Sequence, residues 1–137
     1  MSVPNPKASA PGSSRRRLAA DVLAALRAGK TLEIRAGSRS HRFIGIWVVV
    51  VDGRVFVRSW SRKPRSWWRT FLADPHGAIQ VAGRTMLVRA VRTRSERLKR
   101  AVDRAYLEKY GKGASRRYAL DLNQPACRAT TTELVAS

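Results

Sequence analysis

The sequence predicts one α+β domain in which a mostly antiparallel sheet curls into a small barrel. The chain has 137 residues, which is a usual length for a single domain. Two turn sequences, Asp52-Gly53 and Ala82-Gly83, each join a pair of strand-like segments into a hairpin. Segments with helical periodicity are few, and the strands between them can pair in sequential order.

The N-terminal part predicts a tail followed by a helix. Residues 1–13 are rich in proline and serine and lack apolar periodicity, so we expect a disordered tail before a folded domain at 14–137. Ser14 can cap a helix that Gly29 ends. The apolar residues after Arg15–Arg17 are interrupted by charges, so we favour this helix over an export signal.

Three strands are expected next. Thr31–Ala36 alternates apolar and charged residues, which is typical of a half-buried strand. After the basic loop Gly37–Arg42, the segment Phe43–Val51 is apolar on both faces and predicts a central strand. Asp52-Gly53 suits a type I′ turn, which needs positive φ at both positions, so Arg54–Trp60 is the predicted returning strand.

The rest of the chain predicts two helices, a second hairpin and two final strands. Ser66 can cap the first helix, and Ser95 can cap the second, which has a clear apolar stripe and stops at Gly111. The predicted segments are a helix at 66–73, hairpin strands at 78–81 and 85–93, a helix at 95–110, a basic loop at 112–117, and strands at 118–122 and 128–135.

The net charge is +19, from 28 Lys+Arg and 9 Asp+Glu. Such a field attracts anions, whether nucleic acid, anionic lipid or phosphorylated small molecules, and does not choose among them. A single cysteine excludes an internal disulfide. No apolar run approaches the roughly 18 residues of a membrane span. We therefore expect no membrane partner and a cytoplasmic location.

Residues with catalytic or metal-binding chemistry are scarce. His41 and His76 lie in polar loops without matched metal-ligand spacing, so we predict no metal site. Cys127 lacks a nearby histidine and is interpreted as a half-buried structural thiol. Phosphate-loop, dinucleotide and nucleophile-elbow motifs are not found, so an enzyme of this sequence would rely on a bound cofactor.

Cations and aromatic residues concentrate between Arg54 and Arg69, a segment that contains no acidic residue. Strand alternation places Arg54, Phe56, Arg58 and Trp60 on one face, and the predicted helix start at Ser66 follows. Such a segment can hold phosphate and stack a planar ring. The alternative is structural, with tryptophans sealing a core and arginines in solvent. A second basic run, at 89–104, predicts mainly a solvated helix face.

The segment from Trp47 to Arg69 resembles an uncharacterised bacterial domain family placed among the flavin-binding split barrels. That group includes the pyridoxamine-phosphate oxidases and the deazaflavin-dependent nitroreductases. The similarity runs from about Arg15 to Val135 and includes the segments 73–81, 102–111 and 130–135. It implies a six-stranded antiparallel split β-barrel with a few flanking helices, commonly a homodimer with the cofactor near the subunit interface.

The resemblance also implies a cofactor site. In such proteins a Ser-x-Lys after the second hairpin strand binds the flavin phosphate, and Ser61-Arg62-Lys63 stands at that place. Deazaflavin enzymes carry a glycine-rich turn and Pro-x-Trp instead; this chain has Pro64 without a glycine pair, so FMN and a deazaflavin (coenzyme F-420) both stay open. The candidate cofactor-binding residues are Arg42, Arg58, Ser59, Trp60, Ser61, Lys63 and Trp67.

Three functions follow as hypotheses. The first is a flavin- or deazaflavin-dependent oxidoreductase acting on a small organic substrate. The second is a non-catalytic carrier or sensor of flavin, haem or another anionic ring compound. The third is a nucleic-acid-binding module that uses the basic-aromatic hairpin to stack bases, with at least non-specific binding expected from the charge.

Overall fold

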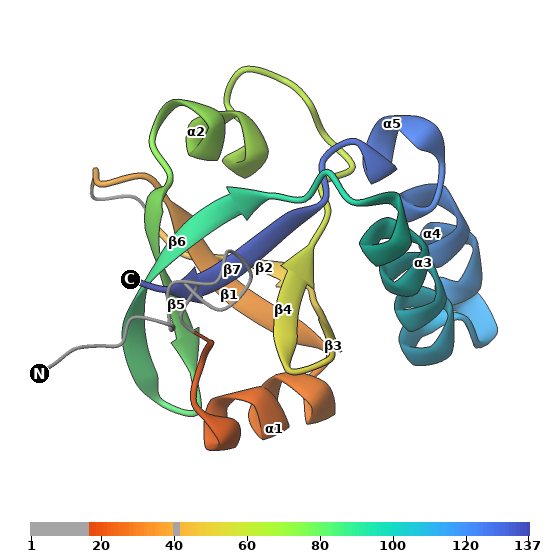
Figure 1. The fold of residues 1–137 in the computed structure, drawn as a ribbon, viewed down its shortest axis with the longest axis horizontal. Helices are drawn as coiled ribbons and strands as arrows, with labels where there is room; N and C mark the ends of the chain where they lie inside the picture. Colours follow the sequence, from red (N-terminus) through yellow and green to blue (C-terminus); the bar gives the residue numbers. More distant parts are fainter. Residues whose placement is uncertain (1–16, 40–41) are drawn as a thin grey trace, which may run out of the picture.

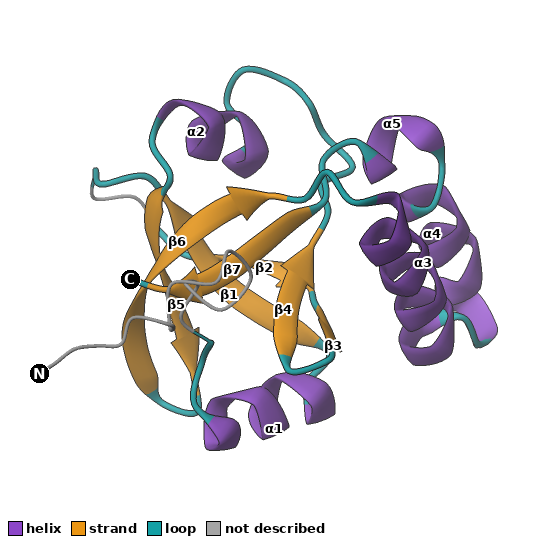
Figure 2. Ribbon diagram, in the orientation of Figure 1, coloured by secondary structure: helices purple, strands orange, loops and turns teal. Residues whose placement is uncertain are grey.

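The computed structural model describes residues 17–39 and 42–137 and contains helices and a single sheet (Figures 1 and 2). The predicted tail at 1–13, the predicted cap Ser14 and His41 lie outside the described residues. The helices are α1 (Ala20–Ala28), α2 (Trp67–Ala73), α3 (Glu96–Tyr110), a 3-10 turn (Gly113–Ser115), α4 (Arg116–Leu122) and α5 (Pro125–Arg128). The strands are β1 (Thr31–Ala36), β2 (Ile44–Trp47), β3 (Val49–Val51), β4 (Arg54–Val57), β5 (His76–Val81), β6 (Arg84–Arg92) and β7 (Thr132–Ala136).

The seven strands form one antiparallel sheet in the order β2-β1-β5-β6-β7-β4-β3. Because β2 and β3 follow each other in the chain yet stand at opposite ends of this order, the sheet is a nearly closed barrel. The α+β class is confirmed. The count of seven strands differs from the six expected, since the predicted central strand Phe43–Val51 is divided between β2 and β3.

Val48 is the point at which the predicted central strand divides. Its N–H donates to the hydroxyl of Tyr110 at 3.1 Å, and its carbonyl accepts from the ammonium of Lys109 at 2.9 Å. The Tyr110 hydroxyl also lies 2.5 Å from the carbonyl oxygen of Lys30 and 3.1 Å from that of Val48, so its one proton is shared. Both polar groups of the buried Val48 backbone are thus satisfied by α3 rather than by a strand. The chain can therefore bend here and pair with β1 before it and β4 after it.

Both predicted hairpins are confirmed. Asp52 and Gly53 have φ of 53° and 71°, and Ala82 and Gly83 have φ of 51° and 75°. Positive φ at two successive positions is what a type I′ turn requires, and it matches the twist of the flanking strands. The turns set the registers that pair Val51 with Arg54 and Val81 with Arg84.

Two predictions for the C-terminal part are wrong. Segment 118–122, predicted as a strand, belongs to the helix α4, and the final strand begins at Thr132 because α5 extends to Arg128. In α4 the buried side chains are Ala119 and Leu122, three residues apart, which is a helical spacing. They pack with α3 in an apolar cluster outside the barrel, and no strand of the described sheet pairs with this segment.

The protein has two apolar clusters, one inside the barrel and one outside it. Strand β4 contributes to both: Val55 and Val57 point into the barrel, and Phe56 points outward beneath α3. Helices α1 and α2 close opposite ends of the barrel, and α3, α4 and α5 cover one side (Figure 1). None of the helices in the described ranges is long and apolar enough to cross a membrane.

We predict that Tyr110→Phe lowers the free energy of unfolding by about 1–3 kcal/mol, because the buried N–H of Val48 loses its acceptor. Tyr118→Phe is the matched control: the Tyr118 hydroxyl bonds to exposed Arg117, and its loss should cost less than about 0.5 kcal/mol. Urea unfolding of both variants measures the difference. Equal losses would contradict the role assigned to Tyr110.

Candidate functional site

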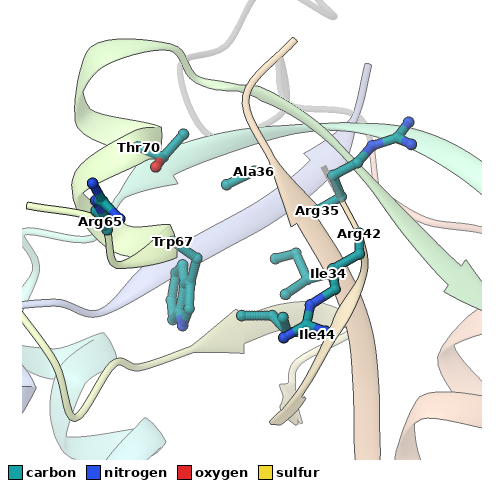
Figure 3. A pocket seen from close by; sticks show the side chains of 8 residues that line it. All are labelled: Ile34, Arg35, Ala36, Arg42, Ile44, Arg65, Trp67 and Thr70. Atoms are coloured by element: carbon teal, nitrogen blue, oxygen red, sulfur yellow. The ribbon is translucent and has the colours of Figure 1, made fainter. Parts of the chain in front are cut away.

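An open cleft lies at the end of the barrel that α2 covers, and it encloses about 230 Å³ (Figure 3). Its walls are α2 on one side and β1 with the start of β2 on the other. The lining residues are Ile34, Arg35, Ala36, Arg42, Ile44, Arg65, Trp67 and Thr70. Among the described residues the lining contains three arginines and no carboxylate, so the cleft favours an anion.

Helix α2 is held over the barrel by its cap and by one buried ring. Ser66 caps α2 as predicted, with its hydroxyl accepting from the N–H of Arg69 at 3.3 Å. Phe71 is buried against Gly77 of β5, where a Cβ would lie 2.6 Å from the carbonyl oxygen of Arg35 and 2.8 Å from the Phe71 ring. The bare backbone at Gly77 therefore lets the helix approach. Trp67 then contacts Phe71 edge to face, with ring centroids 6.0 Å apart.

Asp74 ties the end of α2 to the segment that leaves β1. One carboxylate oxygen accepts from both the N–H and the hydroxyl of Ser38, at 2.8 and 2.6 Å, and the other accepts from the N–H of His76 at 3.1 Å. These bonds, chiefly that from the Ser38 hydroxyl, hold the pKa of Asp74 below its usual value. The contact fixes the two walls of the cleft relative to each other.

The cleft combines an aromatic surface with unpaired cations. Figure 3 shows the Trp67 ring extending from α2 toward Ile34 and Ile44, with the Arg42 guanidinium close to Ile44. Arg42 and Arg65 are exposed, and Arg35 is half-buried with its guanidinium 4.8 Å from the centre of the Phe43 ring. Within residues 17–39 and 42–137, none of these three arginines has a carboxylate within 4.0 Å. An apolar ring with an anionic substituent therefore suits this site.

Arg58, a candidate phosphate-binding residue, lies outside this cleft and is occupied by protein partners. Its side chain is fully buried, and each guanidinium nitrogen donates to an acceptor. The acceptors are Thr131 Oγ1 (2.8 Å), Asp103 Oδ1 (2.7 Å), the Leu122 carbonyl (3.1 Å), Asn123 Oδ1 (3.0 Å) and the Lys99 carbonyl (3.0 Å). Burial lowers the pKa of Arg58, and the hydrogen bond that Arg58 donates to Asp103 opposes that shift. Arg58 joins β4 to α3, α4 and the approach to β7.

The face predicted to carry Arg54, Phe56, Arg58 and Trp60 is mostly covered. Phe56 and Arg58 are 0% and 2% exposed because α3 packs over them, and Arg54 forms a bidentate pair with Glu133 at 2.8 and 3.0 Å. Trp60, which lies beyond the end of β4, is 45% exposed. In this structure the hairpin therefore offers no continuous open face for stacking bases.

The remaining candidates divide between the cleft and the segment after β4. Ser59 is buried, and its N–H donates to Thr130 Oγ1 at 2.8 Å while its hydroxyl donates to the Ser61 carbonyl at 2.5 Å. Ser61 accepts from the N–H of Lys63, whose side chain is exposed. Of the seven candidates, only Arg42 and Trp67 line the cleft. A cofactor role for the other five stays a prediction.

Sequence reasoning missed three polar residues of the lining, Arg35, Arg65 and Thr70. Arg65 lies within the basic run Arg54–Arg69, where the sequence alone does not distinguish it from its neighbours. Arg35 is one of the charged residues that alternate along β1, and alternation alone does not tell which of them borders a cavity. Thr70 becomes visible only once α2 is placed over the barrel.

We predict that Arg58→Gln lowers the free energy of unfolding by about 3–5 kcal/mol, because its buried acceptors lose their partner. The control Arg62→Gln changes an exposed residue of the same segment and should cost less than about 0.5 kcal/mol. Chemical denaturation measures both. An Arg58→Gln protein as stable as the parent but weaker in flavin binding would show that Arg58 serves the ligand instead.

Comparison with solved structures finds the conserved hypothetical protein Rv2991 from Mycobacterium tuberculosis, with a TM-score of 0.53 and 12% sequence identity. The match covers 90% of this chain and 81% of that chain. At this identity the similarity shows a shared fold alone. Comparison with curated proteins finds no match.

Comparison with protein families gives a match over residues 22–134, which includes β1 to β6, the first three residues of β7, both walls of the cleft and the Arg58 contacts. The family is described as an uncharacterized protein conserved in bacteria (DUF2255). Since the match spans well over half of the chain, the protein is a member of this bacterial family.

Proposed function

We propose that the protein binds an anionic flavin, either FMN or a deazaflavin (coenzyme F-420), in the cleft beneath α2 and acts as an oxidoreductase on a small organic substrate. The observation that carries this proposal is the grouping of Arg35, Arg42 and Arg65 around Trp67 without a carboxylate. The expectation of such a cofactor comes from the resemblance of the 47–69 segment to flavin-binding proteins.

The lining residues fit the two parts of such a cofactor. Trp67, Ile34 and Ile44 offer apolar surface for the face of a planar ring system. The guanidinium groups of Arg42 and Arg65 can hold a phosphate or an oligoglutamate tail through paired N–H donors. The cleft volume, about 230 Å³, is below the roughly 300 Å³ of the smallest usual ligand sites, so the charged tail would extend outside it.

The flavin would supply hydride transfer, and the chain would bind and orient it. Trp67 and the two isoleucines would exclude water from one face of the ring, and the arginines would fix the anionic end. The proposal includes a homodimer, in which a second subunit would cover the open side of the cleft.

The lining also favours a second candidate, a flavin carrier or sensor without turnover. Among the described residues the cleft offers no carboxylate, imidazole or thiol that could move a proton. The hydroxyl of Thr70 donates to the Ser66 carbonyl at 3.2 Å. Reduction of bound flavin by a chemical reductant, followed by reoxidation only when an organic acceptor is added, would support the oxidoreductase over the carrier.

We predict saturable binding of FMN or coenzyme F-420, weakened about tenfold or more by Arg42→Ala and by Arg65→Ala, because each variant removes charge-assisted hydrogen bonds. Fluorescence anisotropy of each flavin measures this. Arg89→Ala is the matched control, since Arg89 is an exposed arginine that does not line the cleft. Trp67→Leu should also weaken binding while leaving the salt dependence unchanged.

Two results would contradict the proposal. One is the lack of saturable binding below roughly 1 mM for either flavin, which corresponds to an affinity too weak for a resident cofactor. The other is an equal loss of affinity in the Arg89→Ala control, which would make the binding a property of the overall charge.

A further inference from the structure

A second surface, away from the cleft, combines exposed aromatic rings with arginines. Trp60, in the segment after β4, is 45% exposed, and Tyr118 of α4 is 42% exposed. Their ring centroids are 6.3 Å apart with the rings nearly perpendicular, at 89°. Because the two exposed rings adjoin, they form one apolar patch, and such patches are found at contact sites. We call Trp60, Arg62, Arg117 and Tyr118 the Trp60–Tyr118 surface.

The rings of this surface rest on a rigid support. Trp47, at the end of β2, contacts Trp60 with centroids 5.3 Å apart, and it stacks face to face on Tyr110 at 4.0 Å and 2°. Tyr110 in turn is fixed by its hydrogen bonds to the Val48 and Lys30 backbone. Because Trp60 packs on Trp47, and Trp47 on the hydrogen-bonded Tyr110, the Trp60 ring needs little further ordering when a ligand binds. This lowers the entropic cost of stacking a ligand on Trp60.

The charged groups around these rings are mainly cationic. The guanidinium of Arg117 lies 4.9 Å from the centre of the Tyr118 ring and donates to the Tyr118 hydroxyl at 2.9 Å. Arg62 is exposed and lies two residues after Trp60 in the chain. Burial raises the pKa of the Cys127 thiol on α5, and the charge of Arg62 partly opposes that rise. The acid nearest to Arg117 along α4 is Asp121, whose charge acts on that guanidinium.

We propose that the Trp60–Tyr118 surface binds single-stranded nucleic acid, with bases stacked on Trp60 and Tyr118 and phosphates near Arg62 and Arg117. Aromatic rings interleaved with arginines are how sequence-tolerant single-strand binders work, since every base has a stacking face. Duplex bases are already stacked and offer no such face. This assignment is independent of the flavin proposal, because the Trp60–Tyr118 surface and the cleft share no residue.

The charge of the Trp60–Tyr118 surface favours nucleic acid over a second copy of the chain as its binding partner. A two-fold contact through this surface would bring Arg62 and Arg117 of one copy against the same residues of the other. A polyanion with exposed rings matches both features of the surface, and another copy matches only the aromatic one.

The test measures binding of a fluorescein-labelled dT12 oligonucleotide by fluorescence anisotropy. Inorganic polyphosphate, which has charge but no bases, is then added as a competitor. Trp60→Leu and Tyr118→Leu should each weaken dT12 binding about tenfold, as expected for the loss of stacking on one base. Neither variant should change the affinity of the protein for polyphosphate, as derived from the competition. Trp68→Leu is the matched control, since Trp68 carries its own arginine, Arg69, at 5.4 Å but lies on α2.

The arginines are tested by the dependence of affinity on salt. Arg62→Gln and Arg117→Gln should each reduce the slope of log affinity against log salt by about 0.7, whereas Trp60→Leu should leave the slope unchanged. Circular dichroism monitors folding, and if Trp60→Leu unfolds, the exposed helix variant Tyr118→Leu decides. Equal dT12 affinity in the parent, Trp60→Leu and Tyr118→Leu proteins would overturn the proposal and leave only non-specific charge. A flavin titration of the same variants separates this outcome from failure of the cleft.

Discussion

The contact between Tyr110 and Val48 is the interaction on which most of this structure depends. Val48 lies between β2, which pairs with β1, and β3, which pairs with β4. Because β1 and β4 are not adjacent in the sheet, the chain must bend at Val48 to pair with both. Tyr110 and Lys109 supply the hydrogen bonds that a strand partner would have given. The barrel can therefore close almost completely within about 100 residues, and β2 is held where its first residues border the cleft. The same tyrosine ring supports Trp47 and, through it, Trp60.

The large positive charge is easier to interpret once the ion pairs between arginines and carboxylates are known. Two of the four described acids with an ion pair, Glu133 and Asp103, bind arginines that hold the fold together. Glu133 binds Arg54, and Asp103 binds both Arg58 and Arg128 where β4 meets α3 and α5. The arginines of the cleft and of the Trp60–Tyr118 surface have no such pair within the described ranges. The acids thus neutralise structural cations, and the arginines of both places lie near tryptophans. Other exposed arginines, such as Arg89, also have no carboxylate within 4.0 Å among the described residues, so the tryptophans rather than the charge distinguish the two places. Function is to be sought there rather than in the net charge.

Local sequence signals were sufficient for the hairpins and for the helix starts at Ser66 and Ser95, because these depend on neighbouring residues. The predicted cap Ser14 is wrong, since α1 begins at Ala20 and its N-cap is Ala19. Asp52-Gly53 and Ser95 act within a few residues, and the structure confirms them. The bend at Val48 depends on Tyr110, 62 residues away, so no pattern in Phe43–Val51 reveals it. Segment 118–122 alternates like a strand and folds as a helix because its neighbour is α3 rather than the sheet. Tertiary contacts decide such segments.

The candidate site was predictable to a similar extent. Trp67 and Arg42 do lie together, since the resemblance located the loop before β2 and the start of α2. The sequence does not distinguish Arg58 from exposed arginines, because strand alternation cannot show that α3 covers the face of the hairpin that carries Arg58. The five acceptors of Arg58 lie on segments far from it in the sequence. No sequence pattern identifies Asp103 of α3 as the partner of Arg58.

We propose that the cleft beneath α2 is a flavin site separate from the Trp60–Tyr118 surface. The four tryptophans of the chain provide four indole N–H resonances that report on both places. Titration of 15N-labelled protein with FMN and with coenzyme F-420, followed by assignment of the shifted indole signals, is the most direct measurement. We expect a saturable shift of the Trp67 signal with at least one flavin, while the Trp60 signal stays in place. A Trp67 signal that neither flavin moves, or a flavin that moves only Trp60 and Trp47, would contradict it.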